Sequence, residues 1–394
     1  MENIVNECKA LEDKLIELRR ELHKVPEIGG ELPETRKIVC RYLDEIGVPY
    51  KLNPDDDGLV AEIKGGKTGK TIAFRADMDG LHINEDNSLP YKSIIDGQMH
   101  GCGHDAHTAI LLVAAEIINK HKDELCGNVR LLFQSGEETG TGAKEMLKIG
   151  AIDGVDAACA IHVGNLARND RKPGEMVVLP GPVSAGKNKF TVTVYGKGTH
   201  TAFPDDGIDP ILIASNIVSE CAKYSQEELP KSAILNFGTF NAGVDHNTIP
   251  ETATLKGGIR VQDPVLREKI GEKLIEISEA QAKKYGGRAV VDLKRGSATV
   301  MNDVSLSEFV ANSVAKVLGR EMVTTSLEKP LMGSDDFANY ASIIPSVYFI
   351  LHTNNPDKNI NATNHNPSFD IDEAVLWEGV AAYTAIALDY LKNI

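Results

Sequence analysis

The sequence predicts an α/β protein built from two domains. The chain has 394 residues, more than one ordinary core accommodates. Before residue 186 and after residue 296, apolar strand-like segments alternate with helix-like segments, which is typical of a sheet covered on both faces. Between these positions the order changes to strand-helix-strand-strand-helix-strand, the ferredoxin-like order. We therefore expect residues 1–185 and 297–394 to form one domain and residues 186–296 to be inserted into it.

The N-terminal part begins with two predicted helices. The first is expected to end at Val25-Pro26, because the residue before a proline disfavours helical backbone. The second is expected to end at Gly47, since glycine is common just after helix C-termini. The elements expected before the insertion are helices 4–24 and 33–46, strands 58–65 and 71–76, a helix within 99–122, strand 128–134, helix 141–149 and strand 157–161.

The insertion and the C-terminal part are assigned in the same way. Segment 190–196 alternates apolar and polar residues, as a half-buried strand does. The other elements expected within the insertion are helices 209–225 and 264–285 and strands 232–243, 253–262 and 289–295. After the insertion we expect helices 305–318 and 334–342, strand 346–351 and a final helix over 372–391.

Acidic or histidine residues follow four of the predicted strands, the last of which, 346–351, is followed by His352. Ligands of open α/β sheets bind outside the carboxyl ends of the strands. Residues that are far apart in the sequence can therefore meet at one rim of the sheet. We expect this of Asp77, Asp79, Glu137, Glu138 and His162.

The segment MHGCGHDAHT (99–108) holds three histidines, one cysteine and one aspartate. Sulfur, imidazole and carboxylate together are the donors of a transition-metal site. Glycines on both sides of Cys102 allow a sharp turn, so Cys102 and His104 can converge on one ion. Asp105 stands where the N-cap of the following apolar helix is expected. The alternative is a solvated histidine-rich turn, but five metal-competent side chains in so short a loop favour a metal site.

Glu137 and Glu138 are adjacent carboxylates that follow a buried strand. One of them can bind a metal while its neighbour takes a proton from water. The alternative is a solvated acidic turn, which the position after a strand disfavours. His162 ends an apolar strand, where it is either a core histidine or a ligand, and its place beside other polar strand ends favours the ligand.

Other candidates are weaker from the residues alone. His365 lies in a polar loop, where a histidine is usually a surface residue. Asp77 and Asp79 are either ligands or carboxylates that orient a ligand histidine. In the insertion, His200 follows a strand on a glycine-rich turn and is either a substrate-facing group or a turn residue.

Asn247 and Arg260 are candidate binders of an anionic substrate, Arg260 because its guanidinium matches a carboxylate. By themselves, these two residues are better explained as a turn asparagine and a surface arginine.

Composition narrows the possible partners. Lys plus Arg number 42 and Asp plus Glu 57, which gives a net charge of −15. We therefore expect no nucleic acid or anionic membrane surface as a partner. No apolar run is long enough to span a bilayer, and the N-terminal segment has the pattern of an amphipathic helix rather than a signal peptide. The six cysteines show no paired spacing, which favours a reducing, cytoplasmic location.

Several motifs occur in an order that resembles a known family. They are RADMDGLHI, MHGCGHDAHT, SGEE, IHVG, GKGTHTAFP, NTIPETATLKGGIR, GSDDF and NHNPSF. The chain resembles the metal-dependent aminoacylase and glutamate-carboxypeptidase superfamily over nearly its whole length. Within this superfamily it is similar to the amidohydrolase branch of hippurate hydrolases, N-acyl-amino-acid deacylases, N-acetyldiaminopimelate deacetylases and plant indole-acetyl-amino-acid hydrolases.

The resemblance implies a zinc-peptidase-like α/β/α catalytic domain with an inserted ferredoxin-like domain that acts as lid and mediates homodimerisation. Glu137 matches the general base, and Asp79 matches an aspartate that supports a ligand from behind. His200 matches a lid histidine that reaches the active site of the partner subunit. Residues that match substrate-holding positions are Asn247, Arg260, Gly333 and Ser334, and those that match the ligands of a two-metal centre are Cys102, His104, Glu138, His162 and His365.

The resemblance therefore implies a binuclear metal-dependent amidohydrolase that cleaves the amide bond of N-acyl amino acids. Two divalent ions are expected, zinc or manganese before cobalt or nickel. The alternatives are a metallo-dipeptidase or carboxypeptidase acting on small peptides, and a non-catalytic metal-binding or thiol-sensing protein that uses Cys102. Glu137 beside Glu138 disfavours the last, because metal storage needs no base.

The chain departs from the common family pattern at three places. Gly80-Leu81-His82 stands where relatives commonly have Ala-Leu-Pro, and Gly101 where they often have alanine. Asp205-Asp206 follows Pro204 where a second lid histidine is common. These changes leave the expected ligands and base intact, so they bear on substrate preference.

Overall fold

The computed structural model describes residues 2–166 and 171–392. The chain forms two compact units. The first unit contains the chain up to Val183, Val300–Glu328 and the chain from Asp335 onward. The second contains Ser184–Thr299 together with Lys329–Ser334, a short segment that the sequence assigns to the first domain.

An eight-stranded mixed sheet forms the centre of the first unit. Its strands are β1 (Tyr50–Leu52), β2 (Leu59–Lys64), β3 (Lys67–Asp77), β4 (Cys126–Gln134), β5 (Ala157–Gly164), β6 (Met176–Val177), β15 (Val323–Thr324) and β16 (Ser346–His352). They lie in the order β1-β2-β4-β3-β5-β16-β6-β15, and β4, β3, β5 and β16 run parallel. A small ribbon of β7 (Gly181–Pro182) and β14 (Met301–Asn302) lies outside this sheet. The predicted α/β fold class is confirmed.

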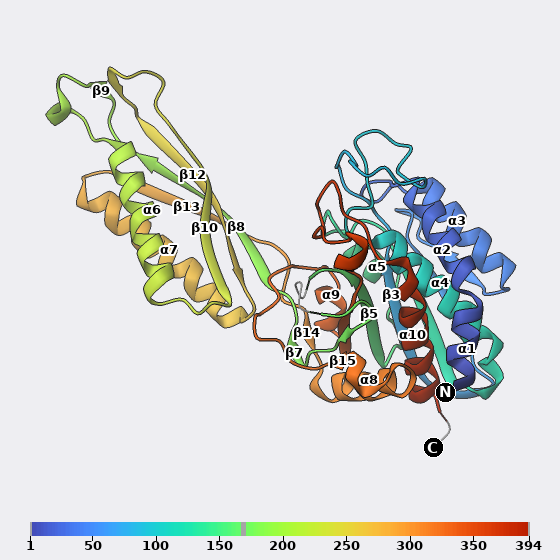
Figure 1. Ribbon diagram of the computed structural model, residues 1–394. Coiled ribbons are helices and arrows are strands. Elements are labelled where there is room, and N and C mark those ends of the chain that lie inside the picture. Colours follow the sequence, from blue (N-terminus) through green and yellow to red (C-terminus); the bar gives the residue numbers. More distant parts are fainter. Residues whose placement is uncertain (1, 167–170, 393–394) are drawn as a thin grey trace. The chain divides into compact units, whose positions relative to one another are not determined.

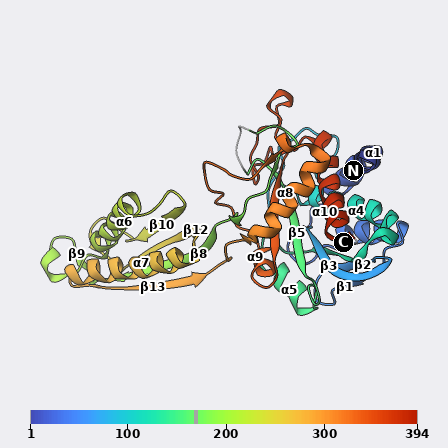
Figure 2. The ribbon, with the colours of Figure 1, turned by 90° about the horizontal axis from the view of Figure 1, so that it is seen from below.

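Helices cover both faces of this sheet. They are α1 (Glu2–Ala10), α2 (Glu12–His23), α3 (Pro33–Glu45), α4 (His104–Lys120), α5 (Gly142–Lys148), α8 (Val304–Leu318), α9 (Ala338–Ala341) and α10 (Leu376–Tyr390). Within this unit, Figure 2 shows α4, α8 and α10 along one face and α5 and α9 on the other. Helix α4 is apolar on nearly all sides and is therefore buried from His104 to Ala115.

Three predicted helices differ from the structure. The first is interrupted at Leu11, which separates α1 from α2. The helix expected over 334–342 is reduced to α9. The Asp336 N–H donates to Glu137 of the site described below, and the Asp335 carboxylate accepts the Phe337 N–H. The final helix begins with a 3₁₀ turn at Glu373–Val375 before α10.

The second unit has its own core. Its strands β8 (Gly186–Tyr195), β10 (Ala233–Ala242), β12 (Thr252–Val261) and β13 (Arg288–Arg295) form an antiparallel sheet in the order β10-β12-β8-β13. Helices α6 (Pro210–Glu227) and α7 (Pro264–Lys284) pack on one face of it (Figure 1). Both helices have an aspartate N-cap followed by proline, a strong start signal. Strands β9 (Thr199–His200) and β11 (Thr248–Ile249) pair antiparallel in a separate two-stranded ribbon.

The strand-helix-strand-strand-helix-strand order expected of the insertion is the order of the main elements in this unit. Across the described residues of both units, no helix combines the length and apolar character that crossing a membrane requires.

Candidate metal centre

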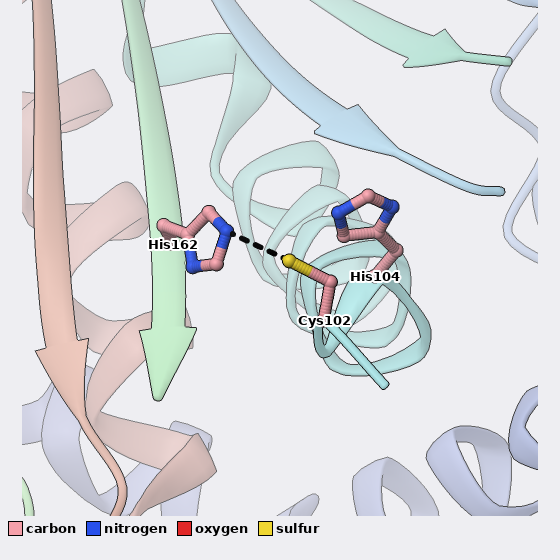
Figure 3. A group of neighbouring side chains, drawn as sticks. All are labelled: Cys102, His104 and His162. Carbon is pink, nitrogen blue, oxygen red and sulfur yellow. Dashed lines mark hydrogen bonds between the residues drawn. The ribbon is translucent and has the colours of Figure 1, made fainter. Parts of the chain in front are cut away.

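Polar side chains gather in the first unit where β3, β4 and β5 end and α4 begins. Figure 3 shows Cys102, His104 and His162 turned toward one another. The Cys102 Sγ lies 3.5 Å from His162 Nε2, and the three residues offer donor atoms within 4.8 Å of one another. The sulfur and two imidazole nitrogens are typical ligands of zinc and its neighbours.

A second group of donors shares the same sulfur. His365 Nε2 lies 3.3 Å from Cys102 Sγ and 3.2 Å from Glu138 Oε1. These three residues again offer donor atoms within 4.8 Å of one another. The structure therefore brings together all five predicted ligands, with Cys102 belonging to both groups.

The turn before α4 depends on Gly103. This residue is the helix N-cap and has φ of +90°, a left-handed conformation that L side chains rarely adopt. A Cβ atom at this position would lie 2.4 Å from Val163 Cγ2. The expectation that Asp105 is the N-cap is wrong, because Asp105 lies inside the helix and binds Arg19 Nε and His23 Nδ1, both at 2.7 Å.

The loop that carries His365 is attached to the loop that carries Cys102. The His365 N–H donates to the Gly101 carbonyl at 2.7 Å, and His365 has φ of +66°. Asn364 Nδ2 donates to the carbonyls of Cys102 and Val163, both at 3.1 Å. These contacts hold a half-exposed histidine next to a buried thiol.

Asp79 supports the two glutamates through their backbone. Its carboxylate accepts the N–H of Glu137 at 3.0 Å and of Glu138 at 3.1 Å. It also lies 3.4 Å from His104 Nδ1. Asp79 thus orients the Glu137–Glu138 turn and faces one candidate ligand from behind.

His107 is buried beside His104 but has another function. Its Nε2 accepts the N–H of Val163 at 2.8 Å, so its proton is on Nδ1, which donates to Asp77 at 2.5 Å. Both nitrogens are therefore used within the protein. Asp77 also lies 3.5 Å from His104 Nε2. Burial would raise the pKa of Asp77, but Arg75 and the two histidines lower it well below its usual range.

Glu137 faces a second acidic cluster that the sequence interpretation missed. Asp335 and Asp336 offer oxygen atoms close to its carboxylate, and the Asp336 N–H donates to Glu137 Oε1 at 3.2 Å. Burial, followed by the charges of Asp335, Asp336 and Glu138, raises the pKa of Glu137 well above its usual range. The signal available in the sequence was the acid pair in GSDDF, which has no predicted strand in front of it.

The residues present suit a pair of metal ions. Both ring nitrogens of His104 and Oε1 of Glu138 are buried and, in the part of the chain that the structure describes, make no hydrogen bond. Burial raises the pKa of the Cys102 thiol, and a bound cation would counter this by favouring the thiolate. Buried atoms of mixed sulfur, nitrogen and oxygen character that are not used in hydrogen bonds are what a metal site requires.

The remaining predicted residues belong to the second unit or its connecting segment. His200 and Asn247 lie together, since β9 pairs with β11 and the Thr201 N–H donates to the Asn247 carbonyl at 3.0 Å. The exposed His200 accepts the Ala202 N–H at Nδ1, which leaves Nε2 as its donor. Arg260 lies near the other end of β12, where it donates to the Met332 carbonyl at 3.2 Å. Gly333 and Ser334 follow directly, and the Gly333 carbonyl accepts the Ala185 N–H.

Comparison with known proteins decides the family. The sequence model of Peptidase family M20/M25/M40 matches residues 73–389. The chain belongs to this family. The predicted family is thereby confirmed, and the chain is a metal-dependent hydrolase of amide bonds. Relatives that include an IAA-amino acid hydrolase of Arabidopsis thaliana, 34% identical over 97% of this chain and 87% of the relative, confirm the predicted amidohydrolase branch.

Relatives of this M20 protein cover it almost completely. Thermostable carboxypeptidase 1 of Saccharolobus solfataricus is 33% identical over 99% of this chain and 98% of the relative. N-acetylcysteine deacetylase of Bacillus subtilis is 33% identical over 98% of this chain and 99% of the relative. The crystal structure of the Bacillus subtilis YXEP protein, a dinuclear metal binding peptidase from the M20 family, matches with a TM-score of 0.84 at 32% identity, covering 98% of this chain and 100% of that one.

Proposed function

We propose that the protein is a binuclear metal-dependent amidohydrolase that hydrolyses N-acyl amino acids to a carboxylate and a free amino acid. The observation that carries this proposal is that Cys102 belongs to two donor groups at once. One group adds His104 and His162, and the other adds Glu138 and His365. Together these five residues would hold two divalent ions.

Two divalent ions held by these five residues would lower the pKa of a water molecule and polarise the amide carbonyl of the substrate. Glu137 is the proposed base. It takes a proton from the attacking water and delivers it to the departing amine. Its raised pKa suits the delivery step, and the cations would lower that pKa enough for the first step.

The residues of the second unit have proposed roles in substrate binding. His200 has a donor at Nε2 and would stabilise the negative charge that develops on the carbonyl oxygen. Arg260 would pair with the substrate carboxylate, as its exposed guanidinium allows. Asn247, Gly333 and Ser334 would complete the binding surface.

Zinc and manganese are the proposed ions. The thiol and imidazoles favour zinc, whereas the carboxylate also admits manganese, and cobalt or nickel would fit the same mixture. Metal titration of the apoprotein with each ion in turn, read by affinity and by restored turnover, would rank them.

We also propose a cytoplasmic homodimer formed through the second unit. The sheet of that unit ends in strand β10, an edge strand with Ile234 and Phe240 exposed. Exposed, apolar edge strands are surfaces on which a second copy can pair. Sedimentation of the wild-type protein and of an F240K variant would test this, since the variant is expected to be monomeric.

A second candidate is a carboxypeptidase acting on small peptides, because the Saccharolobus relative carries that name. A thiol sensor is disfavoured, because such a protein needs an exposed thiol of low pKa, whereas Cys102 is buried and its pKa is raised.

The deciding experiment is amine release from a panel of N-acyl amino acids and dipeptides by metal-loaded protein, repeated after chelation. We expect release from the N-acyl set that chelation abolishes and added metal restores. Release from dipeptides alone would replace the proposal by the peptidase alternative. Absence of release from both sets, with metal shown to be bound, would contradict it.

A further inference from the structure

A buried arginine connects the side of the candidate metal centre that holds His104 to the side that holds Glu137. Arg75 lies on β3 and is 1% exposed. Its Nη1 donates to Asp77 at 2.6 Å, its Nη2 to Asp336 at 2.9 Å and its Nε to Gln134 at 3.0 Å. Asp77 lies next to His104, so one contact of the arginine is with a carboxylate that adjoins a predicted metal ligand.

The carboxylate of Asp336 is held by donors from three elements. Its Oδ1 accepts from Arg75 Nη2 and from Gln134 Nε2 at 2.8 Å. Its Oδ2 accepts the N–H of Ala143, at the start of α5, at 2.8 Å and lies 3.0 Å from Gln134 Nε2. Both oxygens of Asp336 accept hydrogen bonds and the residue is only 2% exposed, so the orientation of its carboxylate is fixed.

Fixing the side chain of Asp336 also fixes its backbone. The Asp336 N–H points at Glu137 Oε1 and donates to it at 3.2 Å. On its other side, Glu137 is held by its own N–H, which donates to Asp79. One carboxylate oxygen of Glu137 is therefore occupied, and the group is restrained in a single orientation.

We propose that Asp336 is a positioning residue for the base, setting the orientation of the Glu137 carboxylate through its backbone N–H. This inference rests on the proposed function, because it assumes that Glu137 is the base. Arg75 and Gln134 act through Asp336 and touch no substrate. A group that orients the base is needed for the chemical step and is not needed to bind substrate or metal.

The test replaces Asp336 by asparagine in the metal-loaded protein. The amide nitrogen of asparagine would face a donor, either Arg75 or the Ala143 N–H, so the side chain must shift and the backbone with it. We expect kcat on an N-acetyl amino acid to fall about tenfold or more, as for other groups that orient a reacting residue. KM and the number of bound ions are expected to stay at the wild-type values.

The matched control is Glu62→Gln. Glu62 on β2 pairs with Arg130 on β4 in the same sheet, so the control also removes a carboxylate from an arginine. It should leave kcat and KM unchanged. Gln134→Glu is the second variant, because it keeps the acceptor for Arg75 Nε but turns an oxygen toward Asp336, and it should lower kcat in the same way.

The outcomes distinguish failure of the proposed function from failure of the positioning role of Asp336. If metal-loaded wild-type protein releases no amine from N-acetyl amino acids, the proposed function fails. If the wild-type protein is active and Asp336→Asn and Gln134→Glu both keep its kcat, the positioning role is wrong. A loss of bound metal or a rise in KM that accounts for the loss of activity would also overturn it, since either assigns Asp336 to the structure of the site.

Discussion

The carboxylate of Asp79 accepts the backbone N–H groups of both Glu137 and Glu138, at 3.0 and 3.1 Å. One buried side chain thus sets the direction of two neighbouring residues with different proposed roles, the base and a metal ligand. The backbone between two adjacent residues sets the directions of their side chains, so this contact is central to the site.

Replacing Asp79 by asparagine should impair both roles together. Asparagine has one accepting oxygen, so one of the two N–H groups would face an amide nitrogen. Metal affinity or kcat is expected to fall by about 10–100-fold, which is typical of groups that orient a ligand. Metal titration followed by kinetics measures both, and a variant with unchanged affinity and kcat would show that the turn holds its shape without Asp79.

Replacing Glu137 by glutamine should separate chemistry from metal binding. The amide has a similar shape but takes no proton, so kcat is expected to fall by about 10²–10⁴-fold. The number of bound ions should not change, because the two donor groups around Cys102 do not include Glu137. Metal analysis and steady-state kinetics on the same preparation test this, and substantial residual turnover would exclude Glu137 as the base.

The parts of the site that were predictable from sequence are those that are local. Cys102 and His104 are two residues apart beside a flexible glycine, so their convergence follows from the loop alone. His365 is different, because it reaches the cluster through its N–H bond to the Gly101 carbonyl, and no spacing in the sequence encodes that contact. Its assignment depended on the resemblance.

The acidic pair in GSDDF shows the same limit. The conformation of Asp336 depends on Arg75, which lies 261 residues earlier in the sequence, and on Gln134 and Ala143. A pattern of helix and strand periodicity carries no information on such contacts, so a helix was expected over 334–342. The main strands and helices were predictable because each buries an apolar face of its own.

Metal should stabilise the folded protein measurably. An ion that binds the native state and not the unfolded state raises the free energy of unfolding by about 2.7 kcal/mol per site when its free concentration is one hundred times Kd. Thermal unfolding with and without chelator should therefore show a higher Tm for the loaded protein. In a Cys102→Ser variant the increase should shrink, because both donor groups lose their shared sulfur. An equal increase in the variant would place the ions elsewhere.

The ion pair between Arg19 and Asp105 should be a large contributor to stability. Both side chains are fully buried, and Arg19 Nε lies 2.7 Å from Asp105 Oδ2. Arg19→Met would leave a buried carboxylate with His23 as its nearest partner, and removing one member of a buried pair costs about 3–5 kcal/mol. Denaturant unfolding measures this difference at neutral pH.

The pH dependence gives an independent check of the same pair. Burial alone would raise the pKa of Asp105, but Arg19 and His23 lower it below its usual range in the folded protein. The stabilisation is therefore complete above the unfolded pKa, about 3.9, and is lost progressively as the pH falls below that value. The free energy of unfolding of the wild type should decrease more steeply than that of Arg19→Met over this acid range. Parallel curves for the two proteins would show that Arg19 does not set the ionisation of Asp105.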